Sequence, residues 1–212
     1  MTYQVKEIFY TLQGEGYHSG RPSVFCRFSG CNLWTGREQD RAKAICKFCD
    51  TDFVGTDGEC GGKYANADEL ANRIWEIWKA ENSEECPFVV LTGGEPLLQL
   101  DSALITCLHA NQCEIAVETN GTIIPPEGID WICCSPKAGA AMRLQGGNEL
   151  KLVFPQMGLD PCEFIGLDFD HFYLQPMDGP MREKNRIAAV QFCKKNPRWK
   201  LSLQTHKILG IP

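Results

Sequence analysis

The chain has 212 residues, of which 43% are hydrophobic and 23% charged, a composition typical of a globular protein, so a single domain over residues 1–212 is expected. Its net charge of −6 argues against direct binding to nucleic acid, because phosphate backbones attract clustered Lys and Arg. No apolar run approaches the roughly 18 residues that span a bilayer, and the first ten residues lack the order of a signal peptide, so a cytoplasmic location is expected.

Segments with strand composition alternate along the chain with segments of helical periodicity, and the sequence contains no internal repeat. The strand segments are rich in β-branched and aromatic residues, or alternate apolar and polar residues. The predicted strands are residues 4–10, 23–29, 88–92, 114–118, 131–134, 149–154, 171–174 and 200–203.

Three segments predict helices. Asn66 followed by Glu69 resembles a capping box, and the apolar residues of 70–78 then share one face, which predicts a helix reaching about Asn82. Further helices are predicted near 98–111 and 180–195.

Alternating strands and helices indicate an α/β fold with a mostly parallel sheet. About six strands in the repeating part, with only three main helices, predict an incomplete TIM-like barrel. Polar and glycine-rich residues follow several of the strands, at 92–95, 118–121, 135–137 and 175–178. Because the carboxyl ends of parallel strands gather on one face of a barrel, we expect the cofactor and substrate sites there.

Twelve cysteines in a chain without an export signal are not expected to form a disulfide framework, because the cytosol keeps thiols reduced. Cys31 follows a predicted strand, and Cys46 and Cys49 form a Cys-x-x-Cys pair that turns two thiolates toward one metal or cluster. A four-iron four-sulfur cluster with three cysteine ligands keeps one iron open, able to chelate the amino and carboxylate groups of a methionine moiety. A structural zinc site with Cys26 as fourth ligand is the alternative, and the spacing alone leaves both open.

Strand alternation separates Cys26 from the other three cysteines. On the predicted strand 23–29, Val24 and Cys26 share one face, while Phe25 and Arg27 share the other. Cys26 is therefore expected to pack beneath the helices and point away from the cysteine loop. If the opposite face lines the barrel, the guanidinium group of Arg27 needs an anionic partner.

The segment Thr92-Gly93-Gly94-Glu95 favours a bound small molecule. It leads from a buried strand into two glycines, which let a ligand approach the backbone closely. Exposed carbonyl groups beside the carboxylate of Glu95 suit an ammonium group, whereas a phosphate loop would need a following Lys and helix-terminal amides.

Together these residues resemble the radical S-adenosylmethionine superfamily, in which a cysteine triad after the first strand is paired with a Gly-Gly-Glu-Pro segment after the second. The superfamily's usual spacing is Cys-x3-Cys-x2-Cys, whereas fourteen residues separate Cys31 from Cys46. This longer loop is similar to that of some 7-carboxy-7-deazaguanine synthases, and the likeness to that family extends nearly from end to end. The segments that carry it are 10–16 (Tyr-Thr-Leu-Gln-Gly-Glu-Gly), 25–28, 49–51, 91–97, 117–121, 135–137 and 174–177.

The resemblance implies a carbon–nitrogen lyase that converts 6-carboxy-5,6,7,8-tetrahydropterin to 7-carboxy-7-deazaguanine with loss of ammonia, in the biosynthesis of queuosine-type 7-deazapurines. One reduced four-iron four-sulfur cluster would cleave S-adenosylmethionine to a 5′-deoxyadenosyl radical, which takes a hydrogen atom from C6 of the pterin and later returns one. The family also implies Mg2+, a homodimer and an electron donor such as flavodoxin, with no direct contact to nucleic acid or membrane.

The resemblance assigns three groups of cofactor ligands. The cluster ligands are Cys31, Cys46 and Cys49. The residues implied for S-adenosylmethionine are Phe48, Cys49, Asp50, Gly94, Glu95, Ser135, Pro136, Lys137, Gln175, Pro176, Met177 and Asp178. Asp50 and Thr51 offer hard oxygen ligands to Mg2+, although such a pair also forms a local Asx-type turn.

The resemblance likewise implies the substrate site. Its residues are Leu12, Gln13, Gly14, Glu15, Arg27, Thr92 and Pro212, whose free carboxylate is expected to contact the pterin. The amide of Gln13 and the carboxylate of Glu15 can read the donor-rich edge of an aminopyrimidinone. Arg27, Glu15 and Glu118 are the expected catalytic residues, with Glu118 either a further substrate contact or an ordinary acid at a strand end.

Two alternative functions were weighed against this one. A glycyl-radical enzyme activase would use the same radical on the glycine of a partner protein, but the segment Leu-Gln-Gly-Glu-Gly at 12–16 argues against it. A non-catalytic zinc-binding module would need a fourth Cys or His placed near Cys49, and the sequence offers none there.

Overall fold

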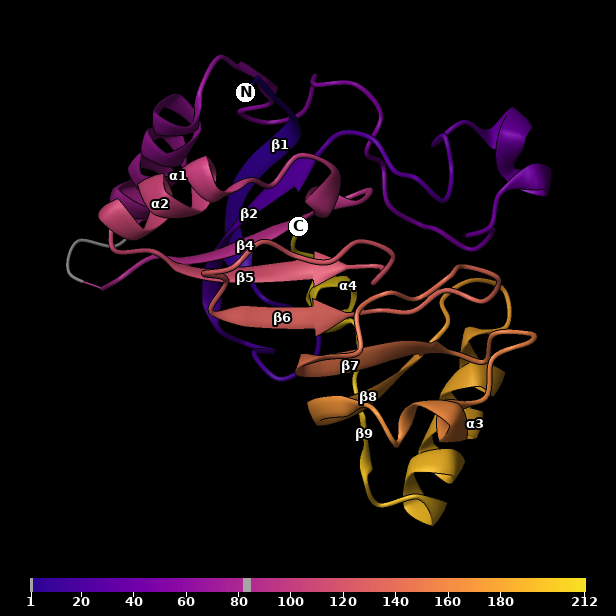
Figure 1. The fold of residues 1–212 in the computed structure, drawn as a ribbon. Coiled ribbons are helices and arrows are strands. Elements are labelled where there is room, and N and C mark those ends of the chain that lie inside the picture. The colour runs from indigo at the N-terminus through magenta and orange to yellow at the C-terminus, as the bar shows by residue number, and fades with distance from the viewer. Residues whose placement is uncertain (1, 82–84) are drawn as a thin grey trace.

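The computed structural model describes residues 2–81 and 85–212. They form one mixed sheet with helices on its outer side (Figure 1). Its strands lie in the order β3-β1-β2-β4-β5-β6-β7-β8-β9. The bounds are β1 (Tyr3–Leu12), β2 (Pro22–Phe28), β3 (Gly62–Tyr64), β4 (Phe88–Gly93), β5 (Glu114–Thr119), β6 (Trp131–Cys134), β7 (Gly146–Phe154), β8 (Asp168–Pro176) and β9 (Trp199–Leu201).

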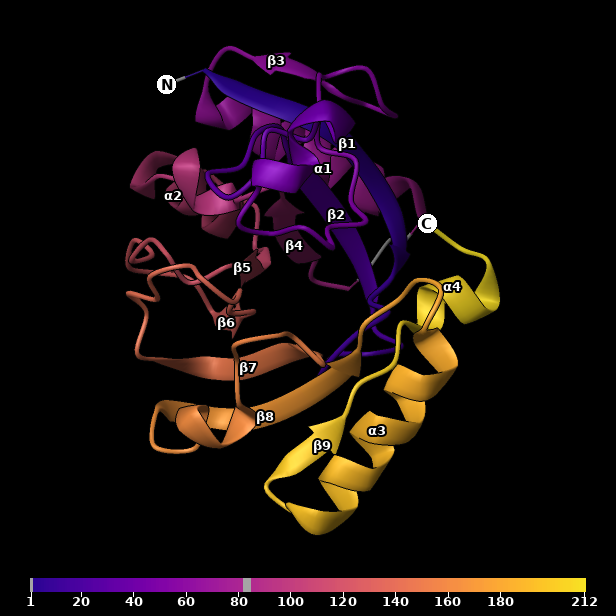
Figure 2. The ribbon, with the colours of Figure 1, turned by 90° about the vertical axis from the view of Figure 1, so that its right-hand side faces the viewer.

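The strands from β2 and β4 through to β9 are parallel, whereas β1 pairs antiparallel with both β2 and β3. The sheet ends at β3 on one side and at β9 on the other, so it is not closed. In Figure 2 it curves from β3 at the top to β9 at the bottom, like part of a barrel wall. The α/β class and the incomplete barrel are thus confirmed, but the sheet has nine strands, where eight strand segments, about six of them in the repeating part, were predicted.

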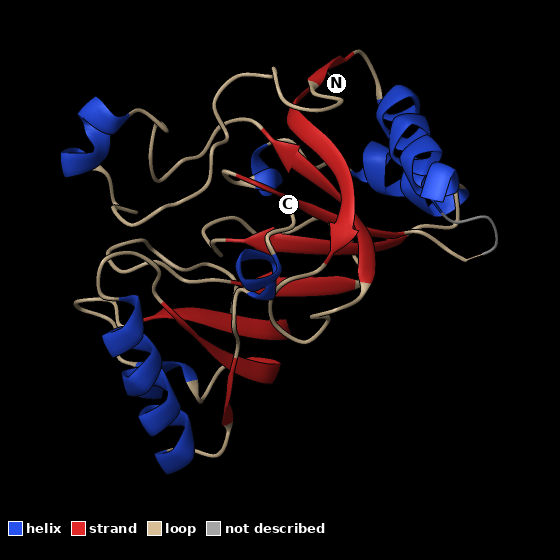
Figure 3. Cartoon of the chain, turned by 180° about the vertical axis from the view of Figure 1, so that it is seen from behind, coloured by secondary structure: helices blue, strands red, loops and turns tan. Residues whose placement is uncertain are grey.

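Helices cover the outer side mainly near the two ends of the sheet (Figure 3). α1 (Ala67–Glu81) packs on β1 and β2, α2 (Ser102–Ala110) packs on β5, and α3 (Arg182–Lys195) packs on β8 and β9. The connections from β5 to β6 and from β6 to β7 contain no helix. The three main helices of the sequence analysis are therefore present. The predicted end of the first, at about Asn82, lies outside the described residues.

The second helix begins later than predicted. The prediction placed the start of this helix near residue 98 and did not take account of Asp101. The carboxylate of Asp101 accepts a hydrogen bond from the amide of Leu104 and so caps the start of α2. The preceding residues form a separate short 3-10 helix, η2 (Pro96–Leu98), capped in the same way by Glu95. Side-chain caps of this kind set both boundaries.

Alternation along β2 sorts its side chains as predicted. Cys26 is fully buried in the core together with Leu70 and Ile74 of α1. Arg27 points to the other side of the sheet, where it lines a cavity inside the barrel. The separation of Cys26 from the cysteine loop is therefore confirmed.

The C-terminal segment crosses from β9 back to β1. It carries α4 (Thr205–Leu209), which was not predicted. The amide of Thr205 donates to the carbonyl oxygen of Gly14 at 2.9 Å, and the hydroxyl of Thr11 donates to the terminal oxygen of Pro212 at 2.9 Å. These bonds hold the segment over the open side of the barrel. None of the helices in the described ranges is long and apolar enough to cross a membrane.

Candidate active site

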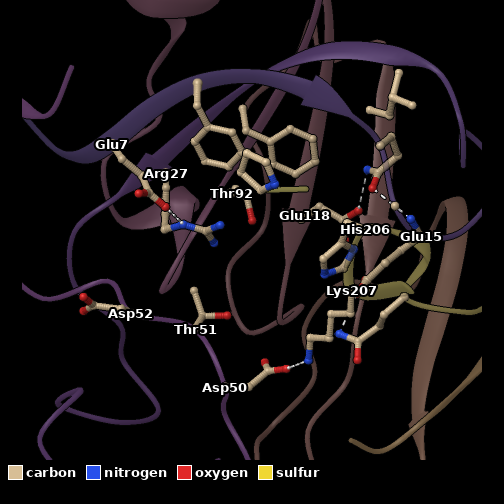
Figure 4. Close-up of a pocket in the computed structure, with 17 residues that line it drawn as sticks. Glu7, Glu15, Arg27, Asp50, Thr51, Asp52, Thr92, Glu118, His206 and Lys207 are labelled. Carbon is tan, nitrogen blue, oxygen red and sulfur yellow. Dashed lines mark hydrogen bonds and ion pairs between the residues drawn. The ribbon is translucent and has the colours of Figure 1, made fainter. Parts of the chain in front are cut away.

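Two adjoining cavities lie on the inner side of the sheet. We call the first, of about 380 Å³, the cysteine cavity, because Cys46 and Cys49 line it. The second, of about 300 Å³, contains Arg27 and is the arginine cavity (Figure 4). Both are lined by Glu15, Asp50, Thr51, Thr92, Glu118 and Gln204. Ligands in the two cavities would therefore touch.

Most of the residues that the resemblance implied for the cofactor line the cysteine cavity. They arrive from the ends of β4, β6 and β8 and from the cysteine loop, as expected of strand ends in a parallel barrel. The ones that line it are Phe48, Cys49, Asp50, Gly94, Ser135, Lys137, Gln175, Pro176, Met177 and Asp178. Lys137 is held in place by Ser135, whose carbonyl and hydroxyl oxygens both accept from its amino group at 2.7 Å.

Glu95 and Pro136 are not among the described residues that line either cavity. The carboxylate of Glu95 is fully buried and accepts hydrogen bonds from the amides of Leu97 and Asn120 and the hydroxyl of Thr119. Burial raises its pKa above the usual value. In this geometry Glu95 holds the loops after β4 and β5 together, and the backbone of Gly93 and Gly94 is what faces the cavity.

The three loop cysteines fit an iron–sulfur cluster. All twelve cysteines of the chain are free thiols. Cys31 lies beside Gly94, where any added Cβ would collide with the Cys31 side chain and the Gly30 carbonyl. A hydrogen bond from the Cys46 thiol lowers the pKa of Cys49 to about 6, which favours the thiolate that binds metals. Cys46 and Cys49 line the cavity together with Phe48, and Cys31 packs with Cys49 against Trp34 and Phe53. Three thiols are the number of ligands that a cluster with one open iron needs.

The fourteen residues between Cys31 and Cys46 form a segment that supports the Cys46-to-Cys49 turn. It contains the 3-10 helix η1 (Glu38–Lys43). Arg41 donates to the carbonyl oxygens of Lys47 and Cys49 at 2.9 and 3.0 Å, and its guanidinium group lies 4.0 Å from the ring centroid of Trp34. Glu38 pairs with the same guanidinium group. The loop thus braces the Cys46-to-Cys49 turn from outside.

Every residue predicted for the substrate lines the arginine cavity, namely Leu12, Gln13, Gly14, Glu15, Arg27, Thr92 and Pro212. The cavity extends from Arg27 and Thr92, near the carboxyl ends of β2 and β4, to the residues that follow β1. Because β1 is antiparallel to β2, the residues that follow β1 enter from the opposite end. The cavity therefore runs along the inner face of β1 and β2, deep into the barrel.

Arg27 already has one anionic partner. Its Nε donates to Oε1 of Glu7 at 2.7 Å, and Figure 4 shows the rest of the guanidinium group directed into the cavity. His206 and Lys207, from α4, lie across the cavity from it. Lys207 pairs with Asp50 and, at 2.7 Å, with Asp178, so it ties the C-terminal segment to both cavities.

A buried charge cluster marks the junction of the cavities. Lys151 of β7, with a side chain only 4% exposed, pairs with Glu15 and Glu118 at 2.8 Å each. Gln175 and Gln204 each donate to Glu15 at 2.9 Å. Burial alone would raise the pKa of Glu15, but Lys151 outweighs it and the pKa falls to about 2. Glu15 therefore presents charged acceptor oxygens at neutral pH.

The sequence analysis missed several lining residues, and only some of them left a signal. Glu149 and Lys151 alternate with Leu150 and Leu152 along β7, so charged side chains face one side and leucines the other. That alternation inside a barrel strand marks Lys151 as inward-facing. His206 and Lys207 lie on a five-residue helix, too short for periodicity to reveal.

Asp50 and Thr51, the implied magnesium ligands, line both cavities. Asp50 is engaged by Lys207. Within residues 2–81 and 85–212, no three His, Cys, Asp or Glu side chains form a group that could hold a single metal ion.

Comparisons with known proteins agree with the geometry. No family model matches the chain. It is 62% identical over 212 residues to the 7-carboxy-7-deazaguanine synthase of Caulobacter vibrioides, with 100% of both chains covered. The enzyme of that name from Bradyrhizobium diazoefficiens is 62% identical over 211 residues and that from Bordetella pertussis 59% over 212, again with 100% of both chains covered.

The fold has a counterpart among solved structures. The crystal structure of QueE from Escherichia coli superposes with a TM-score of 0.70 at 24% identity, over 96% of this chain and 94% of that one. At this level of identity the likeness concerns the fold. Full-length identity of about three residues in five with the curated relatives goes further, and the chain belongs to the 7-carboxy-7-deazaguanine synthase family.

Proposed function

We propose that this chain is a carbon–nitrogen lyase that contracts the ring of 6-carboxy-5,6,7,8-tetrahydropterin to 7-carboxy-7-deazaguanine with release of ammonia, in queuosine-type 7-deazapurine biosynthesis. The observation that carries the proposal is the pair of adjoining cavities, one beside a cysteine triad and one rich in acceptors and cations. Their shared lining suits a reaction in which a cofactor must act directly on a substrate. The name of the relatives supports the same reaction.

On the cofactor side, Cys31, Cys46 and Cys49 would hold a four-iron four-sulfur cluster, and the cysteine cavity would hold S-adenosylmethionine. When bound, these two supply the radical that abstracts and returns a hydrogen atom. The chain orients the cofactor between the Gly93-Gly94 backbone and the strand ends that carry Ser135 and Gln175. Phe48 would limit water at the cluster, which strengthens the electrostatic contacts there.

On the substrate side, the two ends of the arginine cavity have complementary chemistry. Glu15, Glu118 and Gln13 offer acceptor oxygens to the donor-rich edge of an aminopyrimidinone. Arg27 lies on the other side, where it would bind the pterin carboxylate. We propose Arg27, Glu15 and Glu118 as the residues that contact the reacting ring, and the carboxylate of Pro212 as a further contact.

We also propose that Mg2+ bridges the substrate carboxylate and the protein through Asp50 and Thr51, because both line the two cavities and offer oxygen ligands. Activity should therefore rise with added Mg2+, and Asp50→Asn should shift the half-saturating Mg2+ concentration upward. The measurement is the initial rate after chelation and titration. Identical rates across the titration, with an unchanged cluster spectrum, would remove the metal from the proposal.

The proposal includes three expectations from the sequence, namely a cytoplasmic enzyme, a homodimer, and an electron donor such as flavodoxin. Neither of the two alternative functions is favoured. An activase must admit a glycine of a partner protein, whereas the C-terminal segment lines the substrate cavity here and is anchored by the bonds from Thr205 and Thr11. A zinc module would not need the second, arginine-lined cavity.

The cofactor half of the proposal has a direct spectroscopic test. Protein purified without oxygen should be brown, with a broad visible charge-transfer band, and should cleave S-adenosylmethionine after chemical reduction. A colourless protein that retains zinc after the same purification would favour the zinc-binding module instead.

A further inference from the structure

A small internal cavity lies next to the buried charge cluster, on the side away from the cysteine loop. Its volume is about 10 Å³, close to the roughly 10–15 Å³ that one water molecule requires. Glu15 and Glu118 line it from the catalytic side, and Glu149, His18 and Trp131 line it from the other. It therefore lies between the active site and the amino-terminal ends of the parallel strands.

Two side chains that line this cavity each have a buried polar atom without a partner in the described residues. These atoms are Oε1 of Glu149 and Nε2 of His18. Glu149 is only 2% exposed, and its other oxygen accepts from the amide of Tyr17 at 3.0 Å. An unpaired polar atom in such a position is costly, so a hydrogen-bonding partner in the cavity is expected.

The local backbone leaves room for the Glu149 carboxylate. Gly16 has a φ of 66°, and a Cβ added there would collide with both carboxylate oxygens. A side chain at this position would therefore push Glu149 out of its place. The Tyr17 amide can reach the carboxylate only because residue 16 is glycine.

The surroundings of both groups suit proton transfer. Burial raises the pKa of Glu149, opposed by Lys151, while Glu118 and Cys133 are its other polar neighbours. Burial lowers the pKa of His18, helped by Arg21 and His171 and opposed by Glu114. Both shifts favour the neutral form of the side chain.

We propose that one water molecule occupies this cavity between Glu149 and His18, and that Glu149 and this water form a path that returns a proton from the solvent-facing end of the barrel to the Glu15–Lys151–Glu118 cluster. This role rests on the proposed function, in which ammonia is released. His18 is partly exposed and Tyr17, its neighbour, is half exposed, so the outer end of the path meets solvent.

The proton balance of the path is simple. The amino nitrogen leaves the ring with the electron pair of its C–N bond and needs one proton to depart as ammonia. The ammonium group of Lys151, the cation of the cluster, gives up that proton, Glu149 returns one to it, and the water and His18 restore the proton on Glu149 from solvent. No electron is transferred along this path.

The central variant is Glu149→Gln, which keeps the shape and hydrogen bonding of the side chain but cannot carry the proton. We expect kcat to fall about 100-fold with an unchanged KM for the pterin, because Glu149 lines neither substrate cavity. The solvent isotope effect on kcat should rise, since proton delivery becomes slow. His18→Gln should show the same pattern, and His171→Gln is the matched control.

His171 belongs to the same aromatic group, stacked on Tyr17 with ring centroids 4.5 Å apart, but it does not line the small cavity. Its substitution should therefore leave kcat and the isotope effect as in the wild type. A fall in kcat equal to that of His18→Gln would show that general packing is responsible. Wild-type kcat in Glu149→Gln, in a protein that makes product, would overturn the path and leave the proposed function intact.

A crystal structure of the cluster-loaded protein tests the water without any turnover. Density within hydrogen-bonding distance of Glu149 Oε1 and His18 Nε2 would support the site, even if the pterin proves not to be the substrate. Direct contact between the two side chains, with no density between them, would overturn it.

Discussion

At the residue scale, the three loop cysteines differ from the other thiols in what surrounds them. Cys26 is only five positions from Cys31, yet it is fully buried among the helices, where burial raises its pKa far above the usual value. Cys46 and Cys49 line a cavity instead, where the Cys46 thiol lowers the pKa of Cys49 to about 6 while the pKa of Cys46 itself is raised. The side of the fold that each thiol faces therefore separates Cys26 from this pair.

This contrast predicts iron contents. Cys31→Ala, Cys46→Ala and Cys49→Ala should each abolish cluster assembly and turnover, because each removes one of three ligands. Cys26→Ala should keep both. Iron per chain after anaerobic reconstitution is the measurement, and full iron in any of the first three variants would contradict the assignment.

Lys151 is the buried cation that pairs with both Glu15 and Glu118. Replacing it by Met leaves Glu15 and Glu118 without their shared partner, which should lower the free energy of unfolding at pH 7 by roughly 3–5 kcal/mol. Lys63→Met, an exposed position on β3, is the control and should change little. Urea unfolding of the two variants and the wild type measures the difference.

The same comparison has a defined pH dependence. The pKa of Glu15 drops from 4.5 to about 2 on folding, so its contribution is fully present above pH 4.5 and is lost as the pH falls toward 2. The difference between wild type and Lys151→Met should therefore shrink over that window. A difference that stays constant down to pH 2 would show that the ion pair is not its source.

At the element scale, the C-terminal segment closes the arginine cavity. Pro212 lines the cavity, and hydrogen bonds to Gly14 and from Thr11 anchor the segment on the end of β1. Residues added after Pro212 should raise the KM for the pterin and leave the cluster spectrum unchanged. An extension at the N-terminus should have nearly no effect, and equal KM values for both would contradict the proposed contact.

The elements also show which parts of the fold could not be predicted from the sequence. Long periodic segments such as α1 and α3 were predicted, because many residues share one face. β3 has three residues and α4 has five, so neither carries a usable period, and tertiary contacts alone decide their conformation. His206 and Lys207 of α4 were therefore missed, whereas the substrate residues implied by the family resemblance all line the same cavity as these two.

At the scale of the whole molecule, topology explains how one short chain builds two cavities. The parallel strands bring their carboxyl ends to the cysteine loop, which forms the cysteine cavity. The antiparallel β1 reverses direction and delivers Leu12 through Glu15 from the opposite end. The sequence analysis did not predict that reversal, because periodicity identifies a strand but does not give the direction in which its neighbour runs.

The gap between the two edge strands, β3 and β9, also shapes the active site. Because β3 and β9 do not pair, the barrel leaves space that α4 and the C-terminal residues fill. A closed barrel of this size would fill its interior with packed side chains. The incomplete sheet instead keeps room for two ligands in contact, with the Glu15–Lys151–Glu118 cluster between them.

The proposed reaction itself is the most direct test. Cluster-loaded protein should be incubated without oxygen with 6-carboxy-5,6,7,8-tetrahydropterin, S-adenosylmethionine and a reductant, and the products measured by mass spectrometry together with ammonia. We predict 7-carboxy-7-deazaguanine and ammonia in equal amounts. A protein with a full complement of iron that cleaves S-adenosylmethionine but leaves the pterin unchanged would contradict the proposal.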